Sequence, residues 1–147
     1  MAHEFKVTRL VEFSDTDMAG IMHYSNFFRF METAEHGFYR SLGFSVVLDK
    51  HDPPLGFPRV HAECDFKKPL RFEDLVEIQL LVREKKSKSI SYSFRFRNLN
   101  ASPPEEVARG IITIVCVALQ PDGTMKAVPI PAELAGKIEV APAELLD

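Results

Sequence analysis

The stretch SDTDMAGIMHYSNF near the N-terminus gathers residues that could act on an activated ester. The carboxylates of Asp15 and Asp17 precede Gly20, and His23 and Tyr24 follow it before a helical pattern begins. A carboxylate can attack a carbonyl carbon or take a proton from water. A helix start presents unpaired N–H groups that can hold the carbonyl oxygen as it gains charge, and Gly20 would let the substrate approach closely. The pattern predicts ester hydrolysis, against the alternative of a structural loop with a turn-forming Asp and with His23 near the helix cap.

A basic run, REKKSKS at residues 83–89, lies between two predicted strands. Its cationic side chains and serine hydroxyls suit the phosphate groups of a polyanionic ligand. The alternative is an ordinary hairpin turn whose charges are solvated.

The sequence offers no convincing metal site. HAEC at residues 61–64 resembles one half of a zinc deaminase motif, but the Pro-Cys-x-x-Cys half is absent. His-Glu-x-x-His, a glycine-rich phosphate loop and Gly-x-Ser-x-Gly are absent as well. We therefore expect no bound metal and no serine nucleophile, and we expect Cys64 and Cys116 to be reduced and buried.

Length and composition predict one domain that spans residues 1–147. The formal charge of −3 gives no field that would attract nucleic acid or an anionic membrane. No stretch reaches the roughly 18 uncharged apolar residues that a membrane span needs, and no signal peptide is recognisable. We therefore expect a cytoplasmic protein that binds neither nucleic acid nor membrane.

One long helix and several strands are predicted from hydrophobic periodicity. The helix covers residues 24–42, with Ser25 or Asn26 able to cap its start and Gly43 able to end it. Its apolar stripe consists of Phe27, Met31, Ala34, Phe38 and Leu42. Strands are predicted at residues 4–13, 60–66, 75–83, 89–99 and 107–119, with a short one at 125–130 and a terminal helix at 131–138. Short connections favour an antiparallel sheet, which must wrap around the single long helix to bury it, an α+β architecture.

Two segments, VEFSDTDMAGIMHYSNFFRFMETAE and FKKPLRFEDLVEI, resemble the hydroxybenzoyl-coenzyme A thioesterase branch of the hotdog-fold thioesterases. The resemblance extends over about residues 4–132 in length and strand order. It implies a hotdog fold, in which a curved antiparallel sheet of five to six strands wraps around one long helix. It also implies a homodimer whose two sheets join, often paired into a homotetramer, with active sites at the dimer interface near the N-terminal end of the helix.

The resemblance also assigns roles to residues of the opening stretch. Asp17 would be the catalytic carboxylate, as nucleophile or as base toward water, and the N–H of Tyr24 would be the oxyanion donor. His23 is grouped with these catalytic residues, although it stands where the hydroxybenzoyl-specific members carry a bulky aromatic side chain. Some family members use an acid on the long helix instead, a place that Glu32 or Glu35 would fill here.

The resemblance predicts an acyl-coenzyme A thioesterase that releases a free acid and coenzyme A without metal or cofactor. Gly20 and the basic turn would bind the substrate, with the coenzyme A phosphates on Arg83, Lys86, Ser87 and Lys88. One alternative is a thioesterase for acyl carrier protein, which would dock on Lys67, Lys68 and Arg71. The other is a non-catalytic acyl-coenzyme A-binding protein of the same fold.

Overall fold

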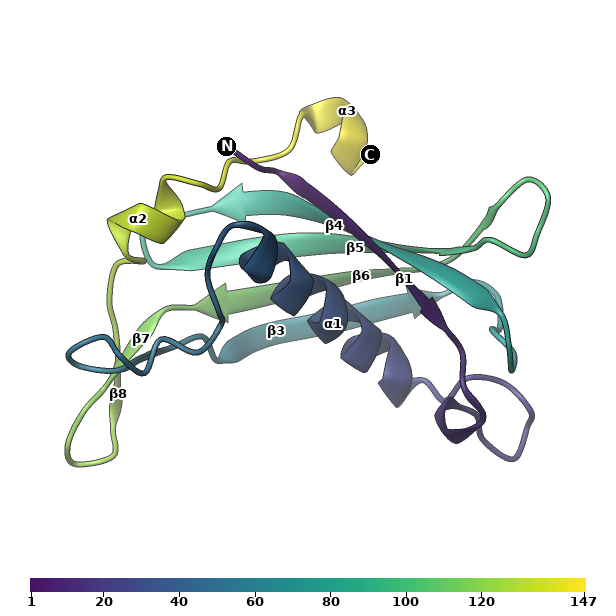
Figure 1. Ribbon diagram of the computed structural model, residues 1–147, viewed down its shortest axis with the longest axis horizontal. Helices are drawn as coiled ribbons and strands as arrows, with labels where there is room; N and C mark the ends of the chain where they lie inside the picture. The colour runs from purple at the N-terminus through teal and green to yellow at the C-terminus, as the bar shows by residue number, and fades with distance from the viewer.

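The computed structural model describes residues 1–147 and is built around one helix, α1 (Ser25–Ser41), which lies across one face of an antiparallel sheet (Figure 1). The sheet has five strands in the order β1-β4-β5-β6-β3. Their bounds are β1 Glu4–Leu10, β3 Arg59–Phe66, β4 Leu75–Lys85, β5 Ser89–Asn98 and β6 Glu105–Val115. The α+β class and the sheet wrapped around one long helix are as the sequence predicts.

Smaller elements complete the chain. A second sheet has the order β2-β7-β8, and two one-turn helices and a 3₁₀ helix lie outside both sheets. Their bounds are η1 Phe13–Asp15, β2 Leu55–Gly56, β7 Val117–Leu119, β8 Met125–Ala127, α2 Ala132–Ala135 and α3 Ala143–Leu146. The short sixth strand expected at residues 125–130 therefore belongs to the second sheet, and the helix expected at 131–138 is a single turn.

Two predicted strands end earlier than expected, each because of a hydrogen bond. The first strand stops at Leu10, since the chain then turns into η1, where the N–H of Glu12 donates to Asp15 Oδ2 at 2.9 Å. The apolar run at 107–119 divides at Cys116, whose N–H donates to the carbonyl of Lys88 at 2.8 Å. The run therefore supplies one strand to each sheet.

The core fills the space between α1 and the sheet. The predicted helical stripe is buried from Phe27 to Phe38, and the apolar side chains of β4 and β5 that alternate toward the helix are buried as well. The Phe27 ring packs edge-on against Phe66 of β3 and Phe96 of β5, with ring centroids 5.0 and 5.3 Å apart. Helix α1 ends before Gly43, which has the positive φ of 85° that favours glycine.

Gly110 of β6 lets the helix approach the sheet closely. A Cβ at this position would lie 2.2 Å from Met31 Cε and 3.1 Å from the carbonyl oxygen of Glu63. Met31 is fully buried, so the end of its side chain would have to shift within the core to admit a Cβ at this position. The Met31 side chain thus occupies the volume that the side chain of any other residue at position 110 would need.

The unpaired thiols are Cys64 and Cys116, and Cys116 is buried whereas Cys64 is half-buried. Burial raises the pKa of the Cys64 thiol to about 12 and also raises the pKa of Cys116. Both thiols are therefore protonated at neutral pH. None of the helices has the length and apolar character that crossing a membrane would require.

Gly110→Ala should lower the free energy of unfolding by about 1–3 kcal/mol, since the added methyl group overpacks the contact with Met31. Gly56→Ala is the matched control, because its nearest neighbour would be Val117 Cγ2 at an ordinary 3.9 Å. Urea titrations of the two variants measure the difference. Equal stability of the Gly110→Ala variant and the natural protein would show that α1 does not depend on this close approach.

Candidate active site

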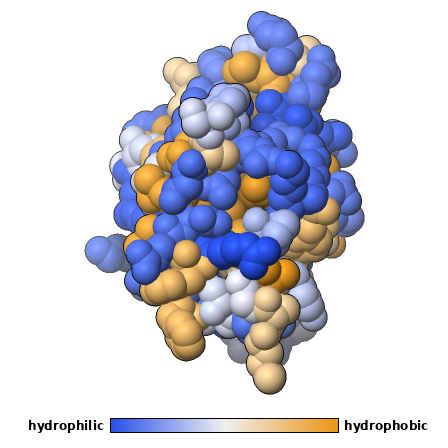
Figure 2. Space-filling model, turned by 90° about the vertical axis from the view of Figure 1, so that its right-hand side faces the viewer, coloured by the Kyte–Doolittle hydropathy of each residue, from blue (hydrophilic) through white to orange (hydrophobic).

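A cavity of about 420 Å³ opens at the N-terminal end of α1. Asp17 and Tyr24 line it together with apolar side chains, among them Met22, Phe27 and Phe66. Figure 2 looks at this end of the molecule and shows hydrophobic surface directly beside hydrophilic surface. The structure thus brings the predicted carboxylate and the predicted oxyanion donor to one cavity with a largely apolar wall.

Asp17 is held in a tight turn. Its Oδ1 accepts a hydrogen bond from the N–H of Ala19 at 2.9 Å, and its carbonyl accepts one from the N–H of Gly20 at 2.9 Å. Gly20 has a φ of 79°, so the turn needs a residue without a Cβ, and Gly20 itself does not line the cavity. Oδ2 of Asp17 makes no hydrogen bond within the chain and the residue is half-buried. One carboxylate oxygen is therefore fixed and the other is available for chemistry.

The main-chain N–H of Tyr24 is free. At this helix start the N–H of Asn26 donates to His23 O at 2.9 Å and that of Phe27 to Tyr24 O at 3.2 Å. The N–H of Ser25 donates to Nδ1 of His23 at 3.2 Å. The N–H of Tyr24 has no partner within the chain, and it lies where the partial positive charge of the helix is greatest. It can therefore donate to the oxygen of a bound carbonyl group.

His23 caps the helix. Its Nδ1 accepts the N–H of Ser25 and lies 2.8 Å from Ser25 Oγ, and its ring stacks on Tyr24 with centroids 4.5 Å apart. Its side chain does not line the cavity. The cap expected from the side chain of Ser25 or Asn26 is thus supplied by His23, and its geometry gives it a positioning role beside Tyr24.

Asp15 fastens the loop to the helix. Its carbonyl oxygen accepts the N–H of His23 at 2.9 Å and Nδ2 of Asn26 at 2.8 Å. Its side chain is occupied by the N–H of Glu12 and does not line the cavity. Of the two neighbouring acids, only Asp17 faces the cavity.

The two acids of the long helix lie elsewhere. Glu32 is exposed, whereas Glu35 is buried and forms an ion pair with Arg59 of β3. Burial raises the pKa of Glu35, and the Arg59 guanidinium opposes this rise. Neither acid lines the cavity beside Tyr24. The geometry therefore favours Asp17 over either helix acid.

The predicted phosphate-binding residues are not near Asp17 in this chain. Lys86, Ser87 and Lys88 form the turn between β4 and β5, at the end of the sheet where α1 ends (Figure 1). β4 runs from Leu75 to Lys85, so roughly 33 Å separates its two ends. Arg83 points onto the face of the sheet away from α1.

Two other basic residues do lie at the cavity. Lys67 and Lys68 line its wall beside Phe66, and each forms an ion pair with a glutamate of β6, Glu106 and Glu105 respectively. The sequence suggested them only as a docking surface for a carrier protein. No local pattern in the sequence indicates that residues 66–69 line the cavity, because this depends on the end of β3 lying against the start of α1.

Comparison with known proteins finds that the model of the thioesterase-like superfamily matches residues 11–138. A 1,4-dihydroxy-2-naphthoyl-CoA hydrolase of Prochlorococcus marinus (strain MIT 9211) is 31% identical over 96 residues, which are 60% of this chain and 64% of the relative. That alignment spans just under two thirds of the hydrolase.

Two solved structures share the architecture. A gentisyl-coenzyme A thioesterase is 33% identical with a TM-score of 0.75, over 90% of this chain and 98% of that chain. The 4-hydroxybenzoyl CoA thioesterase from Pseudomonas sp. strain CBS-3 has a TM-score of 0.81 at 20% identity, over 92% of this chain and 99% of that chain. The second likeness, at this low identity, speaks for the fold alone.

Asn26→Ala should loosen the loop that carries Asp17, because it removes one of the two hydrogen bonds to the Asp15 carbonyl. The loss should lower the free energy of unfolding by about 1 kcal/mol. It should also speed amide hydrogen exchange at His23, whose N–H holds the remaining bond. Unchanged exchange at His23 would show that the loop is fixed by other contacts.

Proposed function

The chain belongs to the thioesterase-like superfamily, and from this premise we propose that it hydrolyses an acyl-coenzyme A thioester to a free acid and coenzyme A. The predictions of a hotdog fold and of a thioester hydrolase are confirmed by the family match and by the named thioesterases that share its fold. The observation that carries the proposal is that Asp17 lines the same cavity as Tyr24, a residue whose N–H has no partner within the chain.

In the proposed reaction, the thioester carbonyl lies between Asp17 and the helix start. Its oxygen accepts the N–H of Tyr24, which stabilises the negative charge as the carbonyl carbon becomes tetrahedral. Asp17, ionised, either attacks the carbon or takes a proton from the attacking water. The acyl–sulfur bond breaks, water supplies the hydroxyl of the acid, and a proton ends on the thiol of coenzyme A. The reaction as proposed requires no metal or cofactor.

We propose an aromatic acyl group as the substrate. The rings of Phe27 and Phe66 on the cavity wall suit edge-on packing against a planar ring. The dihydroxynaphthoyl and gentisyl thioesters named for two relatives are of this kind. Assay of aryl against straight-chain acyl-coenzyme A compounds tests this choice.

We further propose a homodimer in which the partner supplies the basic turn. β3 is an edge strand of eight residues whose side chains are mostly exposed, which suits pairing with a second copy. A second chain could bring Lys86 and Lys88 toward Asp17, from which they are remote within one chain. Two unpaired cysteines are consistent with a cytoplasmic setting.

A carrier-protein thioester is the second candidate substrate. Lys67 and Lys68 on the cavity wall are the observation that favours it, because an acidic carrier protein would meet them at the cavity mouth. Comparing kcat/KM for one acyl group on coenzyme A and on a carrier protein separates the two candidates.

Asp17→Asn should lower kcat by about 100-fold or more with little change in substrate binding, because it removes the charge that attacks or accepts the proton. Asp15→Asn is the matched control, since its side chain faces Glu12 and not the cavity. Steady-state assay with a thiol-detecting dye measures both. Loss of turnover in Asp15→Asn but not in Asp17→Asn would show that Asp15, and not Asp17, is the catalytic acid.

Replacing Lys86 and Lys88 by Ala should raise KM and leave kcat nearly unchanged, because both contacts hold substrate and transition state alike. Hybrids made by refolding this variant together with Asp17→Asn should turn over substrate with the natural KM. In such a hybrid, one site combines an intact Asp17 with an intact basic turn from the other chain. A KM that stays raised in verified hybrids would mean that the basic turn does not act on the partner's site.

A further inference from the structure

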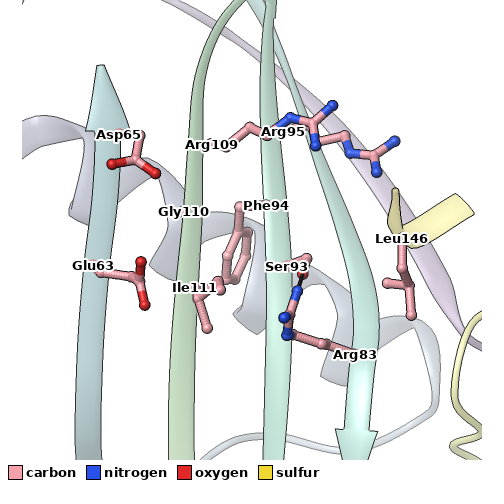
Figure 3. Close-up of a pocket in the computed structure, with 10 residues that line it drawn as sticks. All are labelled: Glu63, Asp65, Arg83, Ser93, Phe94, Arg95, Arg109, Gly110, Ile111 and Leu146. Atoms are coloured by element: carbon pink, nitrogen blue, oxygen red, sulfur yellow. Dashed lines mark hydrogen bonds between the residues drawn. The ribbon is translucent and has the colours of Figure 1, made fainter. Parts of the chain in front are cut away.

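A second cavity, of about 130 Å³, lies on the face of the sheet away from α1 (Figure 3). Its wall comes from β3, β4, β5 and β6, and Leu146 of α3 borders it. The helix-facing side chains of the same strands are apolar, whereas those at this cavity are mostly charged or hydroxylic. The proposed thioesterase reaction makes no use of this charged group.

Two arginines stand directly opposite each other at this cavity. Arg95 of β5 pairs in register with Arg109 of β6, and Figure 3 shows their guanidinium groups near one another. Like charges in directly opposite positions destabilise a sheet. Partial burial, and next the charge of Arg109, lower the pKa of Arg95. An anion bound between the two groups would relieve the repulsion.

Most of the donors of these arginines are unused. Arg95 donates to the main-chain oxygen of Asp147 at 2.7 Å, and Arg109 donates through Nε to Glu106 at 2.9 Å. Each guanidinium has five N–H groups, so both retain free donors. Each arginine therefore has one anionic neighbour, Glu106 for Arg109 and Asp147 for Arg95, and still keeps N–H groups that are free to bind a ligand.

A third guanidinium and a hydroxyl also line this cavity. Arg83 of β4 lies with its Nη1 3.4 Å from Oγ of Ser93, and Ser93 is buried in the sheet. Figure 3 shows the Arg83 guanidinium beside Ser93 and apart from the adjacent groups of Arg95 and Arg109. The Arg95–Arg109 pair alone therefore offers two neighbouring guanidinium groups to a phosphate.

The opposite wall of the cavity is acidic. Glu63 and Asp65 project from β3 (Figure 3), and neither carboxylate forms an ion pair with an arginine. Glu63 is paired with His61 at 2.8 Å. Carboxylates accept hydrogen bonds from the hydroxyl groups of a sugar. They would also repel a second anion at this wall.

We propose that this cavity binds a sugar phosphate, with the phosphate on Arg95 and Arg109 and the sugar hydroxyls toward Glu63 and Asp65. The sheet separates this cavity from the one that Asp17 lines, because the two lie on opposite faces. Binding here is therefore independent of the proposed thioesterase reaction and can be measured without it.

Calorimetric titration with ribose 5-phosphate at constant ionic strength tests the proposal. The natural protein should bind it more tightly than inorganic phosphate, and ribose alone should not bind. Arg95→Met and Arg109→Met should each weaken binding by about tenfold or more, the scale of one lost charged hydrogen bond. Arg97→Met is the matched control, since Arg97 shares the strand and face of Arg95 but pairs with Glu77 at 3.7 Å and does not line the cavity.

Glu63→Gln separates the two halves of the site. It should weaken ribose 5-phosphate binding but not inorganic phosphate binding. Three results would overturn the proposal: no binding by the natural protein, an equal loss in Arg97→Met, or a raised KM for acyl-coenzyme A in Arg95→Met. The last result would mean that the arginines hold the phosphates of the thioester substrate. Circular dichroism of each variant establishes that it is folded.

Discussion

The candidate site depends on the carbonyl oxygen of Asp15, which holds the loop against the start of α1. Two donors meet it, the N–H of His23 and the side-chain amide of Asn26. Because His23 in turn accepts the N–H of Ser25, the donors nearest Tyr24 are occupied and the N–H of Tyr24 alone stays free. The interaction that closes the loop thus lies directly beside the unpaired oxyanion donor.

The position of that helix start is set by packing at the other side of the helix. Gly110 admits Met31 against the sheet, and Phe27 rests edge-on against Phe66 and Phe96. These contacts bring the first turn of α1 over the end of β3. The loop then needs only the tight turn at Asp17 to direct a carboxylate into the same cavity.

The helix, most of the strands and the two central site residues could be predicted from the sequence. The hydrophobic periodicity of each element is a local feature, and so is the short spacing between Asp17 and Tyr24. The cavity wall could not be predicted, since Phe66 and Lys67 reach Asp17 only through the register of β3 with β6. The division of the last long strand at Cys116 likewise depends on a carbonyl almost thirty residues away, that of Lys88. The resemblance predicted that the basic turn holds the coenzyme A phosphates, but it gave no indication that the length of β4 keeps this turn far from Asp17 within one chain.

The most direct measurement is a crystal structure of the Asp17→Asn variant with an intact aryl-coenzyme A thioester. The thioester oxygen should lie within about 3 Å of the nitrogen of Tyr24, the usual distance for an N–H donor. The side chain at position 17 should lie on the opposite side of the carbonyl carbon. A thioester bound beside Glu35 or on the outer face of the sheet would contradict this arrangement.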